Sequence, residues 1–203
     1  MIKVGVLELQ GNFSLHHEIF KKIGLESFPI KSKLDLERVD GLVIPGGEST
    51  TISLLMNTFK MYEPIIEFGE TNPIMGTCAG VILMAKRVKD KRVKSLDLLN
   101  IEVERNAYGR QIESSSEIVK YHFGLEKTLS LPTTFIRAPK IKNIGDDISV
   151  FGEFQGSPVA VISGHHLGLT FHPEIDNVET FHKILFDKNS QFYFKKLKAV
   201  NAA

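Results

Sequence analysis

Short apolar runs alternate with helix-like patterns through the first half of the chain. Residues 2–9, 41–47 and 73–80 read IKVGVLEL, GLVIPGG and PIMGTCAG, and glycine turns lie at or just after their ends. Runs this short and this continuously apolar are typical of strands buried on both faces of a parallel sheet. The pattern therefore predicts three parallel strands in this part of the chain.

Helical periodicity fills the segments between and after these runs. In residues 14–24 the apolar positions recur at helical spacing, and Gly24 is a natural stop. Residues 49–70 begin with serine and threonine capping candidates and continue as a helix that we expect to be interrupted near Pro64. Strands that alternate with helices in this way predict a parallel sheet covered by helices on both faces.

The second half of the chain changes character. Residues 96–124, 133–141 and 148–174 alternate apolar and polar positions between turn residues. This predicts antiparallel strands and leaves open whether some of them extend the parallel sheet. Residues 177–200 have the pattern of a final amphipathic helix with a break at Asn189 and Ser190. The basic run 86–94 fits a solvated helix end and loop better than a partner surface.

Composition narrows the functional class. The chain has 203 residues and a net charge of +1, and no apolar run approaches the roughly 20 residues of a membrane span. The N-terminus lacks the pattern of a secretory signal, and the single cysteine suits a reducing cytosol. We therefore expect a cytoplasmic protein with no nucleic-acid or membrane partner. The adjacent histidines at 16–17 and 165–166 make poor chelates, because neighbouring side chains point apart, so we expect no metal.

The single cysteine is the first candidate for chemistry. On composition alone Cys78 is best interpreted as a small core residue, because free cysteine is among the most often buried residue types. However, GTCAG (76–80) has the G-x-nucleophile-x-G form of a nucleophile elbow, a tight strand-to-helix turn. Such a turn places Cys78 at a helix N-terminus, where the dipole favours a thiolate and the N–H of Ala79 can bind an oxyanion.

The segment FHPE (171–174) offers the partner that a reactive thiol needs. Imidazole can act as a base and can later protonate a leaving amine near neutral pH. If the segment is extended, His172 and Glu174 project from the same face, and Glu174 can orient the imidazole. The alternative interpretation is an ordinary surface turn.

The segment PGGEST (45–50) supplies backbone N–H groups after a strand. A phosphate cradle is disfavoured, because no G-K-[ST] follows. Gly46 or Gly47 fits better as an oxyanion donor that faces Cys78 from the neighbouring strand end. Glu48 can bind a substrate ammonium group, or it can simply serve as a first-turn partner of the helix dipole. The sequence leaves both interpretations open.

These motifs together resemble those of a known enzyme superfamily. GTCAG, PGGEST and HPE in combination are similar to the class I (triad) glutamine amidotransferases. GVLELQG, PGGESTT, GTCAGVILMAK, ERNAYGRQ and FIRAP resemble one branch, the PdxT/SNO family, which is the glutaminase subunit of pyridoxal 5'-phosphate synthase. The resemblance runs from residue 2 to about residue 175, in order and at family-like spacing.

The resemblance implies a flavodoxin-like three-layer α/β/α fold with a mainly parallel central sheet and antiparallel strands in the C-terminal half. It implies one class I glutamine amidotransferase domain over residues 1–203 that hydrolyses L-glutamine to L-glutamate and ammonia. The catalytic positions match Cys78, His172 and Glu174, and the expected oxyanion donors remain Gly46, Gly47 and Ala79. The substrate-binding positions match Gly46, Gly47, Glu48, Arg105, Ile136 and Arg137, and Gln10 matches a position near the oxyanion loop and the partner surface.

The resemblance also implies a partner. In the family, ammonia passes to a (β/α)8-barrel synthase subunit of the PdxS/SNZ type within a large hetero-oligomer, and glutaminase activity is weak until that subunit docks. Pyridoxal 5'-phosphate is then a product of the complex, so this chain is expected to need no cofactor.

Other classes stay open beside this one. A sister glutaminase, such as that of imidazole glycerol phosphate synthase, is disfavoured by RNAYGRQ and IRAP. A DJ-1/PfpI-like cysteine-elbow protein is disfavoured by the late HPE, and an inactive binding module by the complete triad. The chain also departs from the family pattern at serines 114–116 and at Glu8. Glu8 follows an otherwise buried strand, so it is either at the exposed end or paired.

Overall fold

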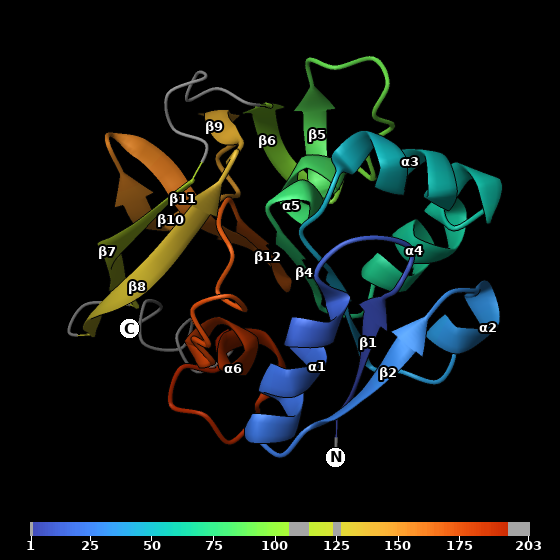
Figure 1. Cartoon of the computed structure of the whole chain (residues 1–203), viewed down its shortest axis with the longest axis horizontal. Coiled ribbons are helices and arrows are strands. Elements are labelled where there is room, and N and C mark those ends of the chain that lie inside the picture. The colour runs from blue at the N-terminus through green and yellow to red at the C-terminus, as the bar shows by residue number, and fades with distance from the viewer. Residues whose placement is uncertain (1, 106–113, 124–126, 195–203) are drawn as a thin grey trace.

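The structure is a computed structural model that describes residues 2–105, 114–123 and 127–194 (Figure 1). Its strands are β1 (Lys3–Leu7), β2 (Glu26–Ile30), β3 (Gly41–Ile44), β4 (Ile74–Thr77), β5 (Ala85–Val88), β6 (Leu99–Glu104), β7 (Ser114–His122), β8 (Thr128–Ile136), β9 (Lys140–Ile144), β10 (Ser149–Phe154), β11 (Ser157–Ser163) and β12 (His166–Leu169). Its helices are α1 (Phe13–Lys22), α2 (Lys33–Leu36), α3 (Ser49–Thr58), α4 (Tyr62–Gly69), α5 (Ala79–Met84) and α6 (Thr180–Phe186).

Two sheets organise the chain. Within the described residues the larger sheet has nine strands in the order β2-β1-β3-β4-β12-β11-β10-β7-β8. Neighbours run parallel from β2 to β12 and antiparallel from β12 to β8. Strands β5, β6 and β9 form the smaller sheet. The three apolar runs of the first half are adjacent parallel strands, as predicted. The second half extends their sheet, but not only with antiparallel strands as predicted, because β12 runs parallel to β4 and β6 runs parallel to β5.

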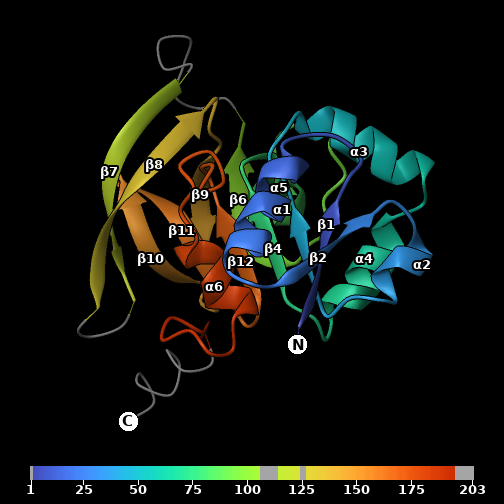
Figure 2. The ribbon, with the colours of Figure 1, turned by 60° about the horizontal axis from the view of Figure 1, so that its bottom comes forward.

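Both faces of the parallel strands are covered by helices. Side chains alternate along each strand. On one face Leu42, Ile44 and Ile74 share a core with α2, α3, α4 and α5, and on the other Val43 and Met75 share a core with α1 and α6. Figures 1 and 2 show α1 and α6 side by side and the β7–β8 ribbon far from α2. This two-sided burial explains why the strand sequences are continuously apolar and confirms the predicted fold class.

The helical segment 49–70 divides earlier than predicted. Helix α3 ends at Thr58, Lys60 has a left-handed φ of 54°, and α4 begins at Tyr62. Pro64 lies in the first turn of α4, where a missing N–H breaks no intrahelical bond, so it does not cause the interruption. The N-cap of α3 is Glu48 rather than a serine or threonine.

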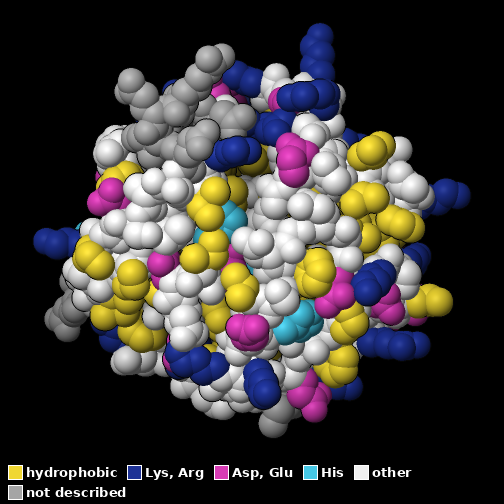
Figure 3. Space-filling view, in the orientation of Figure 1, with side chains coloured by type: hydrophobic (Ala, Val, Ile, Leu, Met, Phe, Trp, Pro, Cys, Tyr) yellow, Lys and Arg dark blue, Asp and Glu magenta, His cyan; other side chains and the backbone are white. Residues whose placement is uncertain are grey.

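The two outer segments differ in part from the predictions. Helix α6 ends at Phe186, and turns and a bend follow over residues 188–192, so the chain does break at Asn189 and Ser190 as predicted. Most side chains of α6 are buried, and residues 195–200 of the predicted segment lie outside the described residues. The basic run 86–94 begins in strand β5 rather than at a helix end. Its lysines and arginines are solvent-exposed, as expected, and Figure 3 shows Lys and Arg side chains gathered at the top of the view over β5.

Glu8 is paired, which is the second of the two alternatives left open by the sequence. It lies directly after β1, and its side chain is paired. Glu8 Oε1 lies 3.1 Å from His17 Nε2, and Oε2 lies 3.2 Å from Lys31 Nζ. A carboxylate can therefore follow a buried strand here without being left unpaired.

Candidate active site

The nucleophile elbow predicted from GTCAG is present between β4 and α5. Cys78 has φ 49° and ψ −98°, and a non-glycine residue adopts such a positive φ only under constraint. Its N–H donates to Leu169 O at 2.8 Å in the neighbouring strand β12. A Cβ on Gly76 would lie 2.6 Å from the carbonyl carbon of Gly80, and one on Gly80 would lie 2.1 Å from Ile44 O. The flanking glycines therefore make room for the turn that presents Cys78.

His172 and Glu174 meet at a turn rather than along a strand. Strand β12 ends before this segment, and the N–H of Ile175 donates to His172 O at 3.2 Å, so the segment forms a turn and the extended alternative does not hold. The turn still brings the side chains together, with His172 Nδ1 2.7 Å from Glu174 Oε1. Asp176 fixes the turn by accepting hydrogen bonds of 2.7 Å from the N–H and the hydroxyl of Thr134 in β8.

Burial and hydrogen bonding set the charge of this pair. Burial disfavours the imidazolium of His172, but interactions with Cys78 and Glu174 outweigh it and raise the pKa of His172 to about 10. Burial opposes ionisation of Glu174, but the electrostatic influence of His16 and the hydrogen bond from His172 lower its pKa. His172 is therefore protonated at neutral pH, close to the sulfur of Cys78, whose Sγ lies 3.7 Å from Ile136 O. An oriented proton donor beside a nucleophile suits the expulsion of an amine.

A cavity of about 640 Å³ opens beside this group. Its lining includes Cys78, His172, Gly47, Glu48, Arg105, Ile136 and Arg137. The volume lies in the range of small-molecule sites, and its walls offer one carboxylate and two guanidinium groups. Arg137 has a left-handed φ of 43°, so constrained backbone borders the pocket at both Cys78 and Arg137. Such a pocket can hold a ligand that carries both a negative and a positive group.

Glu48 caps a helix and also faces the pocket. Its Oε2 accepts the N–H of Thr51 at 2.8 Å, and its Oε1 lies 2.7 Å from Arg105 Nη2. Arg105 also pairs with Asp90. Burial opposes ionisation, but hydrogen bonds from Thr50 and Thr51 lower the pKa of Glu48 to about 2. Because 47% of the Glu48 side chain is exposed, both interpretations left open by the sequence, capping and substrate binding, are compatible with this geometry.

The predicted oxyanion loop packs against the segment that contains Gln10. The N–H of Glu48 donates to Gln10 Oε1 at 2.9 Å, and the N–H of Asn12 donates to Gly46 O at 2.9 Å. The peptide between Gly46 and Gly47 is planar and trans, so its C=O and N–H point in opposite directions. Because the Gly46 carbonyl points towards Asn12, the N–H of Gly47 points away from it. Gly46 does not line the cavity; it lies under the imidazole, where a Cβ would come within 2.3 Å of His172 Cε1.

Ala79 is the first residue of α5, directly after Cys78. Its N–H lies in the first turn of the helix, where N–H groups have no intrahelical partner. The geometry around Gly47 and Ala79 agrees with two oxyanion donors on either side of the nucleophile, and their role stays a prediction.

The sequence interpretation missed two buried histidines behind Glu174. His16 Nε2 lies 3.7 Å from Glu174 Oε2, and His16 Nδ1 lies 2.8 Å from His182 Nε2. In the sequence His16 stands out only as half of an adjacent histidine pair. The available signal was its helical spacing to Ile19 and Phe20, which places it on the buried face of α1.

Two further properties bear on the kind of protein. In the described part of the chain, no group of three or more His, Cys, Asp or Glu side chains has an arrangement that could hold a metal ion. Among the helices of residues 2–105, 114–123 and 127–194, none has the length and apolar character needed to cross a bilayer.

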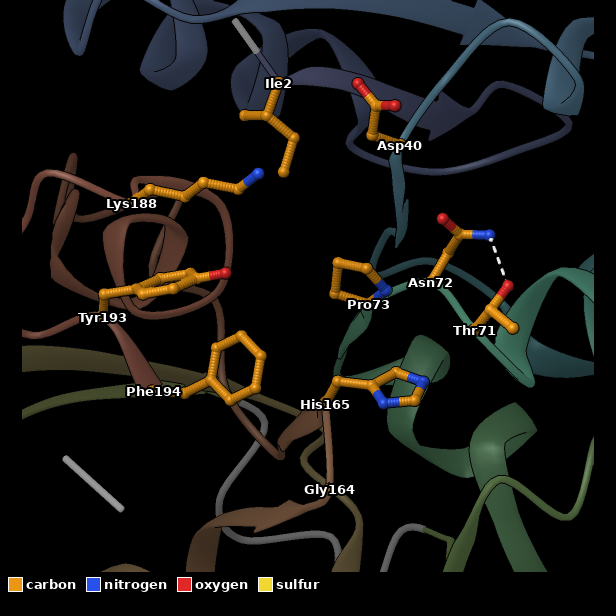
Figure 4. A pocket seen from close by; sticks show the side chains of 10 residues that line it. All are labelled: Ile2, Asp40, Thr71, Asn72, Pro73, Gly164, His165, Lys188, Tyr193 and Phe194. Carbon is orange, nitrogen blue, oxygen red and sulfur yellow. Dashed lines mark hydrogen bonds between the residues drawn. The ribbon is translucent and has the colours of Figure 1, made fainter. Parts of the chain in front are cut away.

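A second cavity, of about 740 Å³, lies at the opposite end of the parallel strands, where these strands begin. Asp40, Pro73 and His165 directly precede β3, β4 and β12, whereas Cys78 follows β4. Figure 4 shows Asp40 and Lys188 from different segments at this cavity, with Asn72 hydrogen-bonded to Thr71. Cys78 lines the first cavity and not this one, so the two cavities lie at opposite ends of the parallel strands.

A model of the SNO glutamine amidotransferase family matches residues 6–190 of the chain. This chain belongs to the SNO glutamine amidotransferase family. The family predicted from the motifs is thereby confirmed.

Curated relatives of this SNO family chain span nearly its whole length. The pyridoxal 5'-phosphate synthase subunit PdxT of Solibacter usitatus is 41% identical over 191 residues, which cover 93% of this chain and 100% of that protein. The subunit PdxT of Brevibacillus brevis is 41% identical over 192 residues, covering 94% and 99%. These matches do not favour the imidazole glycerol phosphate synthase or DJ-1/PfpI alternatives.

Solved structures agree at the level of the fold. A crystal structure of a glutamine amidotransferase is 36% identical with a TM-score of 0.83, covering 97% of this chain and 99% of that one. The structure of PurLQS from Thermotoga maritima, at 16% identity and a TM-score of 0.67, shares the fold over 91% of this chain and 98% of that one. Of the family-like motif ERNAYGRQ, Arg105 reaches the pocket, and residues 106–111 lie outside the described residues.

Proposed function

We propose that this SNO family chain hydrolyses L-glutamine to L-glutamate and ammonia as the glutaminase subunit of a pyridoxal 5'-phosphate synthase. Family membership and the PdxT relatives support the class of reaction. The observation that carries the proposal is the elbow itself: Cys78, held at φ 49°, lies next to a protonated His172 that Glu174 orients at 2.7 Å.

The first half-reaction is acyl transfer to sulfur. The Cys78 thiolate attacks the side-chain amide carbon of glutamine, and the carbonyl oxygen becomes an oxyanion that accepts hydrogen bonds from Gly47 and Ala79. The imidazolium of His172 gives its proton to the departing nitrogen, so ammonia leaves and a glutamyl thioester remains. Losing one oxyanion donor in a site of this type lowers the rate by about 10²–10³.

The second half-reaction returns the enzyme to its starting state. The neutral imidazole of His172 takes a proton from water, and the resulting hydroxide attacks the thioester carbon. The carbon–sulfur bond breaks, glutamate leaves, and Cys78 is again a thiolate beside an imidazolium. Glu174 stays ionised throughout and holds the ring orientation.

Charge complementarity orients the substrate in the pocket. The α-carboxylate of glutamine pairs with Arg105 or Arg137, because guanidinium groups bind carboxylates in a bidentate manner. The α-ammonium group lies against Glu48, which stays ionised because its pKa is about 2. Substrate must then compete with the existing pair between Glu48 and Arg105. Ile136 supplies a carbonyl and an apolar contact beside the sulfur.

The ammonia is consumed by a second protein. The partner we propose is a (β/α)8-barrel synthase subunit of the PdxS/SNZ type, assembled with this chain in a large cytoplasmic hetero-oligomer. Gln10 and the loop it supports form the contact through which docking adjusts the oxyanion site, since Gln10 holds the N–H of Glu48.

The test is an assay of ammonia release by the purified chain, with and without a barrel synthase subunit of this type. We expect release that rises when the partner is present and disappears in Cys78→Ala. Binding of the variant to the partner and its thermal unfolding serve as controls for the fold. Full activity of Cys78→Ala would show that the nucleophile is another group.

A further inference from the structure

Two histidines without exposed surface extend the triad into the core. His16 comes from α1 and His182 from α6, the two helices that pack side by side on the same face of the sheet (Figure 1). Their ring nitrogens are 2.8 Å apart, from His16 Nδ1 to His182 Nε2. On its other side His16 Nε2 faces Glu174 Oε2 at 3.7 Å. A continuous line of polar groups thus runs from Cys78 through His172, Glu174 and His16 to His182.

Glu174 needs a partner for its second oxygen. Its Oε1 binds His172, but its buried Oε2 has no hydrogen bond within the described residues. His16 Nε2 is the polar group that faces this oxygen, slightly beyond hydrogen-bond length. Leaving a buried carboxylate oxygen without any donor dipole would be costly, so the N–H of His16 has an electrostatic role here.

The contacts select one tautomer for each histidine. If His16 carried its proton on Nδ1, its Nε2 lone pair would face the carboxylate of Glu174, which is repulsive. The proton therefore belongs on Nε2, and Nδ1 must accept a hydrogen bond from the Nε2–H of His182. His182 Nδ1 is then unprotonated, and it has no hydrogen-bond partner within the described residues. Burial lowers the pKa of both histidines, which keeps them neutral.

His16 also touches the residue that precedes the nucleophile. The hydroxyl of Thr77, at the end of β4, lies 3.4 Å from His16 Nε2. Thr77 has no exposed surface and is bonded directly to Cys78. One imidazole thus lies between the strand end that carries the nucleophile and the carboxylate that orients the base.

We propose that His16 is a positioning residue for glutamine hydrolysis. It fixes the second carboxylate oxygen of Glu174 relative to the end of β4, and His182 holds His16 in the tautomer that this requires. The inference rests on the triad assigned in the proposed function. Neither histidine lines the pocket, so both act through Glu174 and not on the substrate.

The first test is a double-mutant cycle measured in the complex with the barrel synthase subunit. We expect His16→Leu to lower kcat by about tenfold to hundredfold, the cost of a small misplacement of a catalytic group, with KM for glutamine changed less than about twofold. His16→Gln, which keeps an N–H at the end of the side chain, should recover part of the loss. In a Glu174→Gln background, His16→Leu should cause no further loss, because its route of action is already removed.

The matched control is His17→Leu. His17 is the next residue on the same helix, but it contacts Glu8 and Ser27 instead of the triad, so kcat should be unchanged. Losses from His16→Leu and Glu174→Gln that simply add would overturn the proposal, as would unchanged kcat in His16→Leu. If Cys78→Ala keeps its activity in the same assay, the triad itself is wrong; if Cys78→Ala is inactive and His16→Leu is not, only this inference fails.

The second test needs no variant and covers the case in which His16→Leu does not fold. Nitrogen chemical shifts of the histidine rings distinguish the two neutral tautomers in the full chain. The proposal predicts that His16 and His182 are both neutral at pH 7 with the proton on Nε2. A proton on Nδ1 of His16, or a charged His16, would overturn it.

Discussion

The two sides of Cys78 are built in opposite ways. On the pocket side Glu48 and Arg137 reach solvent, and Glu48 is held by a partly exposed ion pair with Arg105. On the core side His172 and Glu174 are buried and hydrogen-bonded to each other, with His16 and His182 behind them. Around Cys78, the exposed charged groups lie where a substrate enters, and the buried polar groups lie where the proton is handled.

This difference separates binding from proton transfer. Glu48 is about half exposed and Arg105 has a second partner in Asp90, so the pair between Glu48 and Arg105 can open to the charged ends of a substrate without leaving Arg105 unpaired. Buried charges keep their partners, because losing one leaves the other unpaired away from water. Substitutions on the pocket side should therefore change KM, and substitutions on the core side should change kcat and its pH dependence.

The largest effect is expected on the core side, from His172→Ala. Without the imidazole no group protonates the leaving ammonia or activates water, so kcat should fall by about 10³-fold or more while KM changes little. Steady-state glutamine hydrolysis in the assembled complex measures both constants. The exposed His122→Ala, whose ring bonds Thr128 on the β7–β8 ribbon, is the matched control and should behave as wild type. A comparable loss of kcat in His122→Ala would show that the effect is not specific to the core side of Cys78.

Glu174→Gln should change the pH profile as well as the rate. The pKa of His172, about 10 in the folded protein, is raised partly by Glu174. Removing the Glu174 carboxylate should therefore lower the pKa of His172 and move the alkaline limb of kcat/KM to lower pH. The rate at neutral pH should fall by about 10²-fold or more, because the amide no longer fixes the tautomer. An alkaline limb at the wild-type position would contradict the assigned pair.

The same pair makes a prediction about stability. Because the folded pKa of His172 lies above the ordinary 6.5, its protonation stabilises the fold fully below pH 6.5, and this contribution is lost as pH rises towards about 10. The free energy of unfolding from denaturant titrations should therefore decline over that range, and less so in Glu174→Gln. An equal decline in both proteins would assign the effect to other groups.

Arg105→Met tests the pocket side. Removing a charge-assisted hydrogen bond to the substrate carboxylate should raise KM for glutamine by about tenfold to hundredfold and leave kcat within a few-fold of wild type. Arg105→Lys keeps the charge without the bidentate geometry, so its KM for glutamine should lie between those of the wild type and Arg105→Met. A fall in kcat at unchanged KM would place Arg105 on the proton-handling side of the comparison.

The smallest effect is expected from Glu48→Ala measured as stability. Loss of the cap on α3 should lower the free energy of unfolding by about 1 kcal/mol. Glu48→Gln retains an oxygen that can accept from Thr51, so it should recover the stability but not the affinity for the substrate ammonium group. If both variants lost equal stability, the charge and not the cap would hold the helix.

The parts of this account that the sequence predicted depend on local patterns. The apolar runs predicted β1, β3 and β4 because strands buried on both faces leave no polar positions, and GTCAG predicted the elbow because only glycine fits beside Cys78 at such close approach. From the sequence, the pairing of His172 with Glu174 followed only if their segment was extended, and the segment forms a turn instead. Their contact arises in a turn anchored to β8 through Asp176, a long-range constraint that period-two reasoning does not contain.

What the sequence could not predict depends on tertiary packing. His16 and His182 are separated by 166 residues and meet only because α1 and α6 pack on the same face of the sheet. The sequence predicts the helix break near Pro64, but proline fits the first turn of a helix, and the break lies at Lys60 with its left-handed φ. The second role of Glu48, pairing with Arg105, likewise joins residues far apart in the chain.

The most direct test of the account is to trap the acyl-enzyme. The complex is mixed with isotopically labelled glutamine, quenched in acid within one turnover and digested. The mass of the peptide that contains Cys78 is then measured by mass spectrometry. We expect this peptide to gain one labelled glutamyl group through a thioester. Rapid glutamine turnover in the wild type with no adduct on Cys78, or with the label on another residue, would contradict it.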